Sequence, residues 1–277
     1  MQWSKIKTII LLILVMVNAF LLVMTGVQEF RSARYQQEAR TEAAAVLEKN
    51  GITFLPEEIP PGMKLAPLEV TWDRMGENED GMAQALLGEA VRRDRDGELQ
   101  ATYTSELGSA DFYSSGRFLF RLEPGAVPLN GETPQRHAAR CLELLSFDGE
   151  PAGVAQEGSV TVVTFLQRWA GSPIFSCKAV LTYEEDELRA IDAQRISGAS
   201  APAEGTGTLS TASVLIRFLA GIHDGQVSVC NEIRAMTQGY QANLSRPVTS
   251  LTPVWRIVTD TGAYYLDAAT GAITPEL

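Results

Sequence analysis

The sequence predicts an α+β protein with an N-terminal transmembrane helix and an extracytoplasmic module of antiparallel sheets and two helix-plus-strands repeats. Three observations lead to this prediction. One long uncharged apolar stretch lies within the first thirty residues, and no second one follows. Twice in the later part of the chain, a helical apolar pattern is followed by strands with a period of two. With 45% hydrophobic and 21% charged residues, the composition is that of a folded chain.

The apolar stretch predicts a single membrane crossing. Thr8 to Val27 carries no charge, and twenty helical residues span about 30 Å, the thickness of a bilayer's hydrocarbon core. Lys5 and Lys7 precede the stretch, so the positive-inside rule keeps the N-terminus cytoplasmic and the bulk of the chain outside the cell membrane. A cleaved signal peptide is the alternative. The stretch is longer than a signal's apolar region, and its end, Met24-Thr25-Gly26-Val27-Gln28, lacks a convincing small-x-small cleavage site.

Asn18 is the one strongly polar side chain in this stretch. An amide in lipid without a partner costs free energy, so it bonds either to another helix or back to its own helix. Both alternatives stay open. In the first, residues at helical spacing around Asn18 share its face and bind a partner helix. These candidate partner-binding residues are Leu11, Leu14, Val15, Asn18, Leu21, Leu22 and Thr25.

Changes in composition and periodicity divide the chain into six parts. These are a cytoplasmic tip and transmembrane helix (1–28), a juxtamembrane helix (29–51), a β-rich part (52–131), a first α+β repeat (132–198), a linker (199–208) and a second α+β repeat (209–277). The juxtamembrane helix ends at Asn50-Gly51, and its position suits a stalk that continues the membrane helix. The linker is rich in Gly, Ser and Ala, which is typical of a loose loop.

Each predicted repeat begins with a capped helix. Thr133 is the expected N-cap of the first helix, with Pro134 at its first position, and Ser210 opens the second. Alternating side chains predict the strands that follow. In the first repeat they are expected at 160–169, 175–183 and 188–196, and in the second at 227–233, 234–241, 254–259 and 264–268. In the β-rich part, strands are expected at 68–72 and 98–103, with a hairpin over 111–121.

The charge and the motifs argue against several classes of function. A net charge of -11 disfavours nucleic acid as a partner, because phosphates need clustered Lys and Arg. The sequence has no nucleophile elbow, P-loop, dinucleotide fingerprint, H-E-x-x-H or C-x-x-C pattern. We therefore expect a protein that is not an enzyme and that has no catalytic residues and no cofactor.

Histidine and cysteine offer one weak metal candidate. His137 and Cys141 lie four residues apart on one helix, which suits two ligands of one metal. Cys141 belongs to the apolar face of that helix, so we favour a core position and expect no metal site. Cys177 and Cys230 also have the surroundings of small core residues. A disulfide between two of the three cysteines stays open, because the module is expected to face an oxidising exterior.

The remaining polar and aromatic clusters favour structural roles. Glu184 and Glu185 lie at an expected hairpin tip, where a carboxyl group lacks the burial that a general acid needs. The acidic residues Glu77, Glu79 and Asp80 are interpreted in the same way, as solvated charge. Aromatic side chains within the expected strands favour packing over a ligand cage. They are Trp169, Trp255, Tyr264 and Tyr265.

Both ends of the chain resemble a known family. The N-terminal residues Trp3-Ser4-Lys5-Ile6-Lys7-Thr8-Ile9 and Asn18-Ala19-Phe20-Leu21, and the C-terminal Thr252-Pro253-Val254-Trp255-Arg256-Ile257, Gly262, Tyr264-Tyr265-Leu266-Asp267-Ala268 and Thr270-Gly271, are similar to those of YycI-type regulatory proteins. These proteins of Gram-positive bacteria are relatives of YycH. Small sheet modules of the PepSY type also carry the closing C-terminal pattern.

This resemblance implies a membrane-anchored accessory protein without catalytic residues. YycI-type proteins act with a YycH-type companion on the sensor histidine kinase that controls cell-wall metabolism, in large part through transmembrane helix contacts. The first alternative is a cell-surface PepSY-like ligand-binding or peptidase-inhibitory module, which an open cleft lined by Trp169, Trp255 or Tyr264 would favour. The second is an enzyme acting on cell-wall polymers, for which the sequence offers no pair of converging carboxylates.

Overall fold

The structure is a computed structural model of the chain, and it describes residues 14–18, 20, 24, 34–73, 78–203, 205, 207–244 and 247–276. Most of the predicted membrane helix at 8–27 therefore lies outside the described residues. Among the residues that are described, no helix combines the length and the apolar character needed to cross a bilayer.

In the described part of the chain, three consecutive units each consist of one helix followed by four strands. The first unit contains α2 (Glu79–Leu87), β2 (Val91–Asp94), β3 (Leu99–Ser105), β4 (Gly108–Tyr113) and β5 (Arg117–Leu122). The second contains α3 (Pro134–Leu144), β6 (Gly149–Glu157), β7 (Val160–Trp169), β8 (Ser172–Glu184) and β9 (Glu187–Gln194). The third contains α4 (Thr211–His223), β11 (Ile233–Asn243), β12 (Val248–Thr259), β13 (Ala263–Asp267) and β14 (Ile273–Pro275). Strand β1 (Leu68–Trp72) precedes the first unit, and β10 (Gly198–Pro202) separates the second from the third.

The helix starts follow the predicted capping chemistry in two units. The Thr133 side chain accepts a hydrogen bond from the Arg136 N–H, and the Ser210 Oγ accepts one from the Ser213 N–H at 3.1 Å. Helix α2 was not predicted. It begins at Glu79 and Asp80, whose charges suit the positive end of the helix dipole. The acidic residues interpreted as solvated charge thus open a helix, while Glu77 lies outside the described residues.

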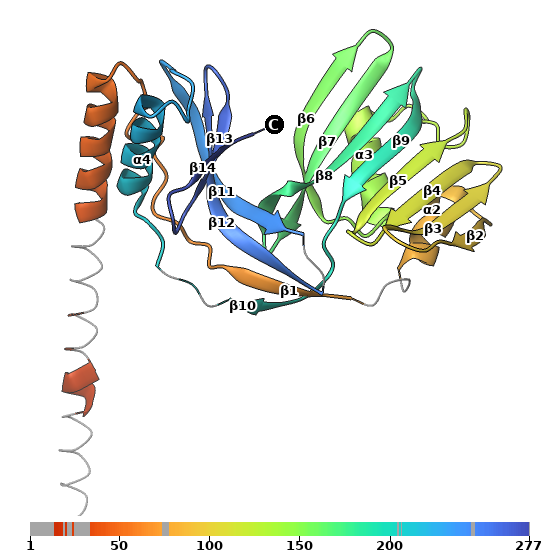
Figure 1. Cartoon of the computed structure of the whole chain (residues 1–277), viewed down its shortest axis with the longest axis horizontal. Coiled ribbons are helices and arrows are strands. Elements are labelled where there is room, and N and C mark those ends of the chain that lie inside the picture. The colour runs from red at the N-terminus through yellow and green to blue at the C-terminus, as the bar shows by residue number, and fades with distance from the viewer. Residues whose placement is uncertain are drawn as a thin grey trace, which may run out of the picture.

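One mixed, largely antiparallel sheet of fourteen strands links the described units (Figure 1). Its main path runs β10-β1-β12-β11-β8-β9-β5-β4-β3-β2. Off this path, β13 pairs with β12 and β14 with β13, and β7 pairs with β8 and β6 with β7. The first and second units join where β5 pairs antiparallel with β9. The second and third join where β8 runs parallel to β11 at Ile174 and Tyr240. The α+β class with antiparallel sheets is confirmed.

Two strand predictions need correction. The strand expected at 227–233 is absent, because residues 227–232 form a loop and one strand, β11, runs from Ile233 to Asn243. The linker expected at 199–208 begins with β10, which pairs with β1 along its whole length. Gly198 permits this pairing, since its φ of 144° and the closeness of the Thr71 carbonyl leave no room for a side chain.

Helices and sheet enclose two main cores. The first and second units share one core, which α2 and α3 close over side chains such as Phe118, Phe120 and Leu181. The third unit has a separate core in which α4 and a helix at residues 34–49 lie against Trp255 and Ile257. Figure 1 shows that helix (orange) beside α4.

The helix at 34–49 is built into the third unit. Ala43, Ala44 and Leu47 are buried in its core. The Arg40 Nη1 donates to the Ile59 carbonyl at 3.0 Å, and the Thr53 N–H donates to the Asn231 carbonyl at 2.8 Å beside β11. The juxtamembrane helix predicted as a stalk is therefore, from Ala43 onward, part of the folded module.

Candidate functional site

The predicted membrane-helix face is described only in part. Leu14, Val15 and Asn18 lie in a described helical segment and are exposed, whereas Leu11, Leu21, Leu22 and Thr25 lie outside the described residues. The Asn18 Nδ2 donates to the Leu14 carbonyl at 2.9 Å. This is the bond back to its own helix. It leaves the Asn18 Oδ1 without a partner among the described residues, available as an acceptor for a second helix.

His137 and Cys141 meet inside the core of the second unit. The His137 ring is fully buried, with Nδ1 3.0 Å from the Tyr183 hydroxyl and 3.6 Å from the Cys141 Sγ. Burial lowers the pKa of His137 and raises the pKa of Cys141 to about 11. Among the described residues, no group of three or more His, Cys, Asp and Glu side chains is placed to hold a metal ion. The predicted core position of Cys141 is confirmed.

The other two cysteines are also core residues. Cys177 and Cys230 are buried, each in a different cluster from Cys141, and all three thiols are free. Burial raises the pKa of Cys177 to about 12 and also raises that of Cys230. The structure therefore has no disulfide between Cys141, Cys177 and Cys230.

The aromatic side chains do not form an open cage. Trp255 is fully buried under α4, and the Tyr264 ring lies 5.8 Å from the Phe218 ring in the same core. Tyr265 is buried on the opposite face of the third unit's sheet, and Trp169 is half-buried against another cluster. The predicted packing roles are confirmed, since Trp255 and Tyr264 are buried in the core of the third unit.

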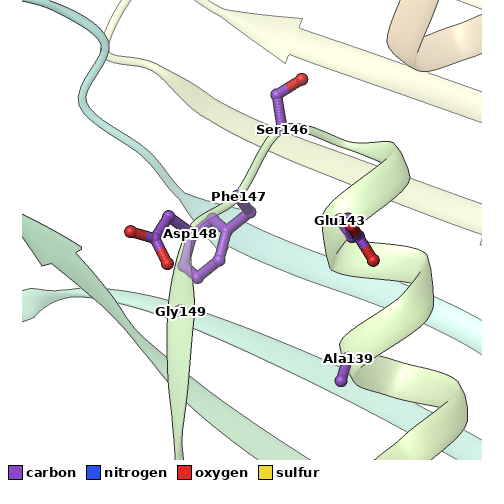
Figure 2. A pocket seen from close by; sticks show the side chains of 6 residues that line it. All are labelled: Ala139, Glu143, Ser146, Phe147, Asp148 and Gly149. Carbon is purple, nitrogen blue, oxygen red and sulfur yellow. The ribbon is translucent and has the colours of Figure 1, made fainter.

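A hollow of about 440 Å³ lies where α3 ends and β6 begins (Figure 2), and its lining residues are Ala139, Glu143, Ser146, Phe147, Asp148 and Gly149. Figure 2 shows Glu143 and Asp148 on opposite sides of the Phe147 ring, with carboxylates that do not point toward one another. Asp148 also pairs with Arg168 at 2.6 Å. The hollow therefore lacks the facing carboxylates that glycoside hydrolysis requires.

The β8–β9 hairpin tip is a charged, solvated turn. A hollow of about 250 Å³ lies beside it, lined by Pro124, Ser159, Val160, Glu184, Glu185, Glu187 and Arg189. Arg189 lies 3.9 Å from Glu184 and 4.0 Å from Glu187, and the Gly125 N–H donates to Glu187 at 2.9 Å. The exposed position of Glu184 and Glu185 agrees with the prediction of solvated charge.

Hydrogen bonds and ion pairs around the partly buried Glu276 connect the second unit to the third. The Glu276 carboxylate accepts from Tyr265 Oη at 2.7 Å and from Arg256 Nη2 at 2.7 Å, and Lys178 Nζ on β8 lies 3.5 Å away. Burial alone would raise the pKa of Glu276, but the bonds from Tyr265 and Arg256 outweigh it and hold that pKa below its ordinary value. The network fixes the Tyr265 ring on the sheet face that α4 does not cover.

That open face of the third unit carries a further cavity of about 430 Å³. Its lining residues come from β11, β12, β13, β14 and the turn before β14, and are Gln241, Ala242, Asn243, Thr252, Val254, Tyr265, Asp267, Ala272 and Thr274. Strand pairing assembles them, because Gln241 is opposite Thr252, Val254 opposite Asp267, and Tyr265 opposite Thr274. Local sequence patterns did not reveal this cavity.

Comparison with known proteins identifies a shared fold. No protein-family model matches the chain, and no curated protein matches its sequence. The structure is similar to that of an uncharacterized protein from Eubacterium rectale, with a TM-score of 0.53 and 13% identity, over 77% of this chain and 86% of that one. It is also similar to the Bacillus megaterium YpeB C-terminal domain, with a TM-score of 0.40 and 11% identity, over 74% of this chain and 99% of that one. The first likeness shows the fold alone, and the second is too low to carry an argument. The YycI resemblance stays a prediction.

Proposed function

We propose that this chain is a membrane-anchored, non-enzymatic regulator of a sensor histidine kinase that controls cell-wall metabolism. In this proposal it acts beside a YycH-type companion, through contacts of its transmembrane helix and of its extracytoplasmic module. The apolar stretch at 8–27 and the resemblance of both chain ends support it. The observation that carries it is the packing of the helix at 34–49 into the core of the third unit.

This packing supports a mechanical link between module and membrane. Leu47 is fully buried and Ala43 and Ala44 are nearly so, which fixes the rotation of the helix relative to the module. The helix follows the apolar stretch along the chain, with its first residues, 34–38, exposed. A partner that turns the module would thereby turn the anchor. Contacts that differ in free energy between two kinase conformations would then shift the populations of those conformations.

Insertions test the link by changing the phase of the helix. We propose that this helix continues into the apolar stretch. One alanine inserted between Arg34 and Tyr35 would then rotate the anchor by about 100° relative to the module, whereas seven alanines would add about two turns and nearly restore the phase. The readout is transcription from a promoter controlled by the kinase's response regulator. We expect one alanine to change the output and seven to restore most of it. Equal outputs from the parent and both variants would overturn the mechanical link.

The partner contact is tested by recovering the kinase with tagged full-length protein. Asn18→Leu removes the Oδ1 acceptor, and Met16→Leu, a neighbouring apolar exchange, is the matched control. We expect reduced kinase recovery and altered output from the Asn18 variant only. Unchanged recovery and output would remove Asn18 from the mechanism. Loss of recovery when only the outer module is deleted would place the contact outside the membrane.

A further inference from the structure

We infer that the cavity on the open face of the third unit binds a short peptide or amino-acid amide through its protonated amino group and its amide groups. The volume of about 430 Å³ lies within the range of small-ligand sites. The inference does not depend on the proposed kinase regulation, because it concerns only side chains of the folded module.

The cavity combines an apolar floor with polar walls. Val254 and Tyr265 are buried beneath it, and the Tyr265 hydroxyl is held by Glu276. Gln241 and Thr252 lie on one side and Thr274 on another, all three at least partly exposed. Such a floor with a few hydrogen-bonding groups around it is the usual construction of a small-molecule site.

Several of the polar groups have no partner in the protein. The side chains of Gln241, Thr252 and Thr274 make no hydrogen bond to any part of the chain that the structure describes. An amide such as that of Gln241 offers both a donor and an acceptor, and a threonine hydroxyl does the same. These groups therefore match the C=O and N–H groups of a peptide.

Asp267 sets the charge that the ligand must carry. Its Oδ1 accepts from the Ala269 and Thr270 N–H groups, both at 2.8 Å, which fixes the carboxylate in place. Its Oδ2 has no partner among the described residues, and no ion pair neutralises it there. Arg256, a basic residue on the adjacent strand β12, is engaged by Glu276 at 2.7 Å. A protonated amine is a ligand group that can donate a charge-assisted hydrogen bond to a carboxylate placed in this way.

The test uses the full-length protein in detergent and two probes that differ only in the amine, alanyl-alanine amide and its N-acetyl form. Calorimetric titration should show binding of the free amine at least about tenfold tighter than that of the acetylated peptide, because a charge-assisted hydrogen bond is lost. Asp267→Asn keeps the acceptor for the two turn N–H groups and should abolish that difference. Thr252→Val should weaken the binding of both probes, whereas Thr237→Val, on β11 outside the cavity, should leave the binding of both unchanged.

Three results would overturn the inference. These are no binding of either probe at millimolar concentration, equal binding of the two probes to the parent protein, and unchanged binding by both cavity variants. Far-ultraviolet circular dichroism and the urea midpoint of each variant establish that it is folded. If neither probe binds but the protein still regulates the kinase, this site is rejected and the proposed function is not. If the probes bind as expected but the kinase is not regulated, the proposed function is rejected and this site is not.

Discussion

Phe175 on β8 lies directly over Gly239 on β11, at the seam between the second and third units. A Cβ at Gly239 would stand 2.5 Å from the Phe175 ring and 2.7 Å from the Pro173 carbonyl oxygen. The same ring lies 5.3 Å from the Tyr265 ring, tilted by 33°. The absence of a side chain at Gly239 therefore allows β8 to approach β11 and to place Phe175 in the cluster with Val254.

Gly239→Ala is expected to destabilise the protein by about 1–3 kcal/mol, because a side chain forced into a packed site strains its neighbours. The Pro173 carbonyl belongs to the backbone and cannot rotate away. Gly153→Ala is the matched control, since a Cβ there meets nothing within 4 Å. The urea midpoints of the full-length variants are compared. Equal midpoints would contradict the claim that β8 can approach β11 only because Gly239 has no side chain.

Leu47→Ala should cost about 2–5 kcal/mol, the usual loss for a leucine truncated in a core. Leu47 is fully buried where the helix at 34–49 meets the third unit. We expect hydrogen exchange to rise first in that helix, because its docking depends on few buried side chains. The neighbouring Glu48→Ala changes an exposed side chain and should leave exchange unchanged. If the helix at 34–49 is equally protected from hydrogen exchange in both variants, its docking does not depend on the Leu47 side chain.

His137 should make stability fall in mild acid. Burial, together with the charge of Arg140, lowers its pKa from the ordinary value of 6.5 in the folded state. As the pH falls, His137 therefore binds a proton in the unfolded chain before it does so in the folded protein. The stability of the fold with neutral His137 is fully present above pH 6.5, and it is lost as the pH falls through the folded pKa.

The measurement is the urea midpoint at neutral and mildly acidic pH. His137→Phe should flatten the decrease, while His223→Gln, which changes an exposed histidine at the end of α4, should retain it. A parent and a His137 variant with the same dependence on pH would show that another group titrates.

The three cysteines should react with a thiol reagent only after unfolding. Each is buried, and burial raises the pKa of all three thiols, so little reactive thiolate forms at neutral pH. We expect slow labelling of the native protein and labelling of three thiols in denaturant. A dithiol reductant should leave the urea midpoint unchanged. Rapid native labelling, or a midpoint that depends on the reductant, would contradict the free, buried state.

Local patterns predicted the elements whose signal lies within the element itself. The caps Thr133 and Ser210 and the alternation along β8 each depend on neighbours in sequence, and the structure confirms them. Helix α2 is hard to predict because it has only nine residues, contains Gly81, and has no side-chain hydrogen bond from its N-cap residue Asn78. Its buried Met82, Ala83, Leu86 and Leu87 carry a helical spacing that was the available signal.

Features assembled by long-range pairing could not be read in the same way. Strand β10 has the composition of a linker, and only its pairing with β1, more than a hundred residues earlier, makes it a strand. The cavity has the same origin. The C-terminal pattern contains Thr252, Tyr265 and Asp267, but it does not show that they lie together. The pairing of β11, β12 and β13 brings them together and adds Gln241.

The core beneath α4 takes Leu47 from near the start of the chain and Leu266 from near its end, with the first and second units between them. During synthesis the helix at 34–49 is made first. Its apolar side chains stay exposed while the first and second units are synthesised and fold around their own core. The core of the third unit, which contains the helix nearest the proposed anchor, is therefore the last core to fold. Slow translation or a stalled ribosome would leave that surface open to chaperones and proteases while the first and second units are already folded.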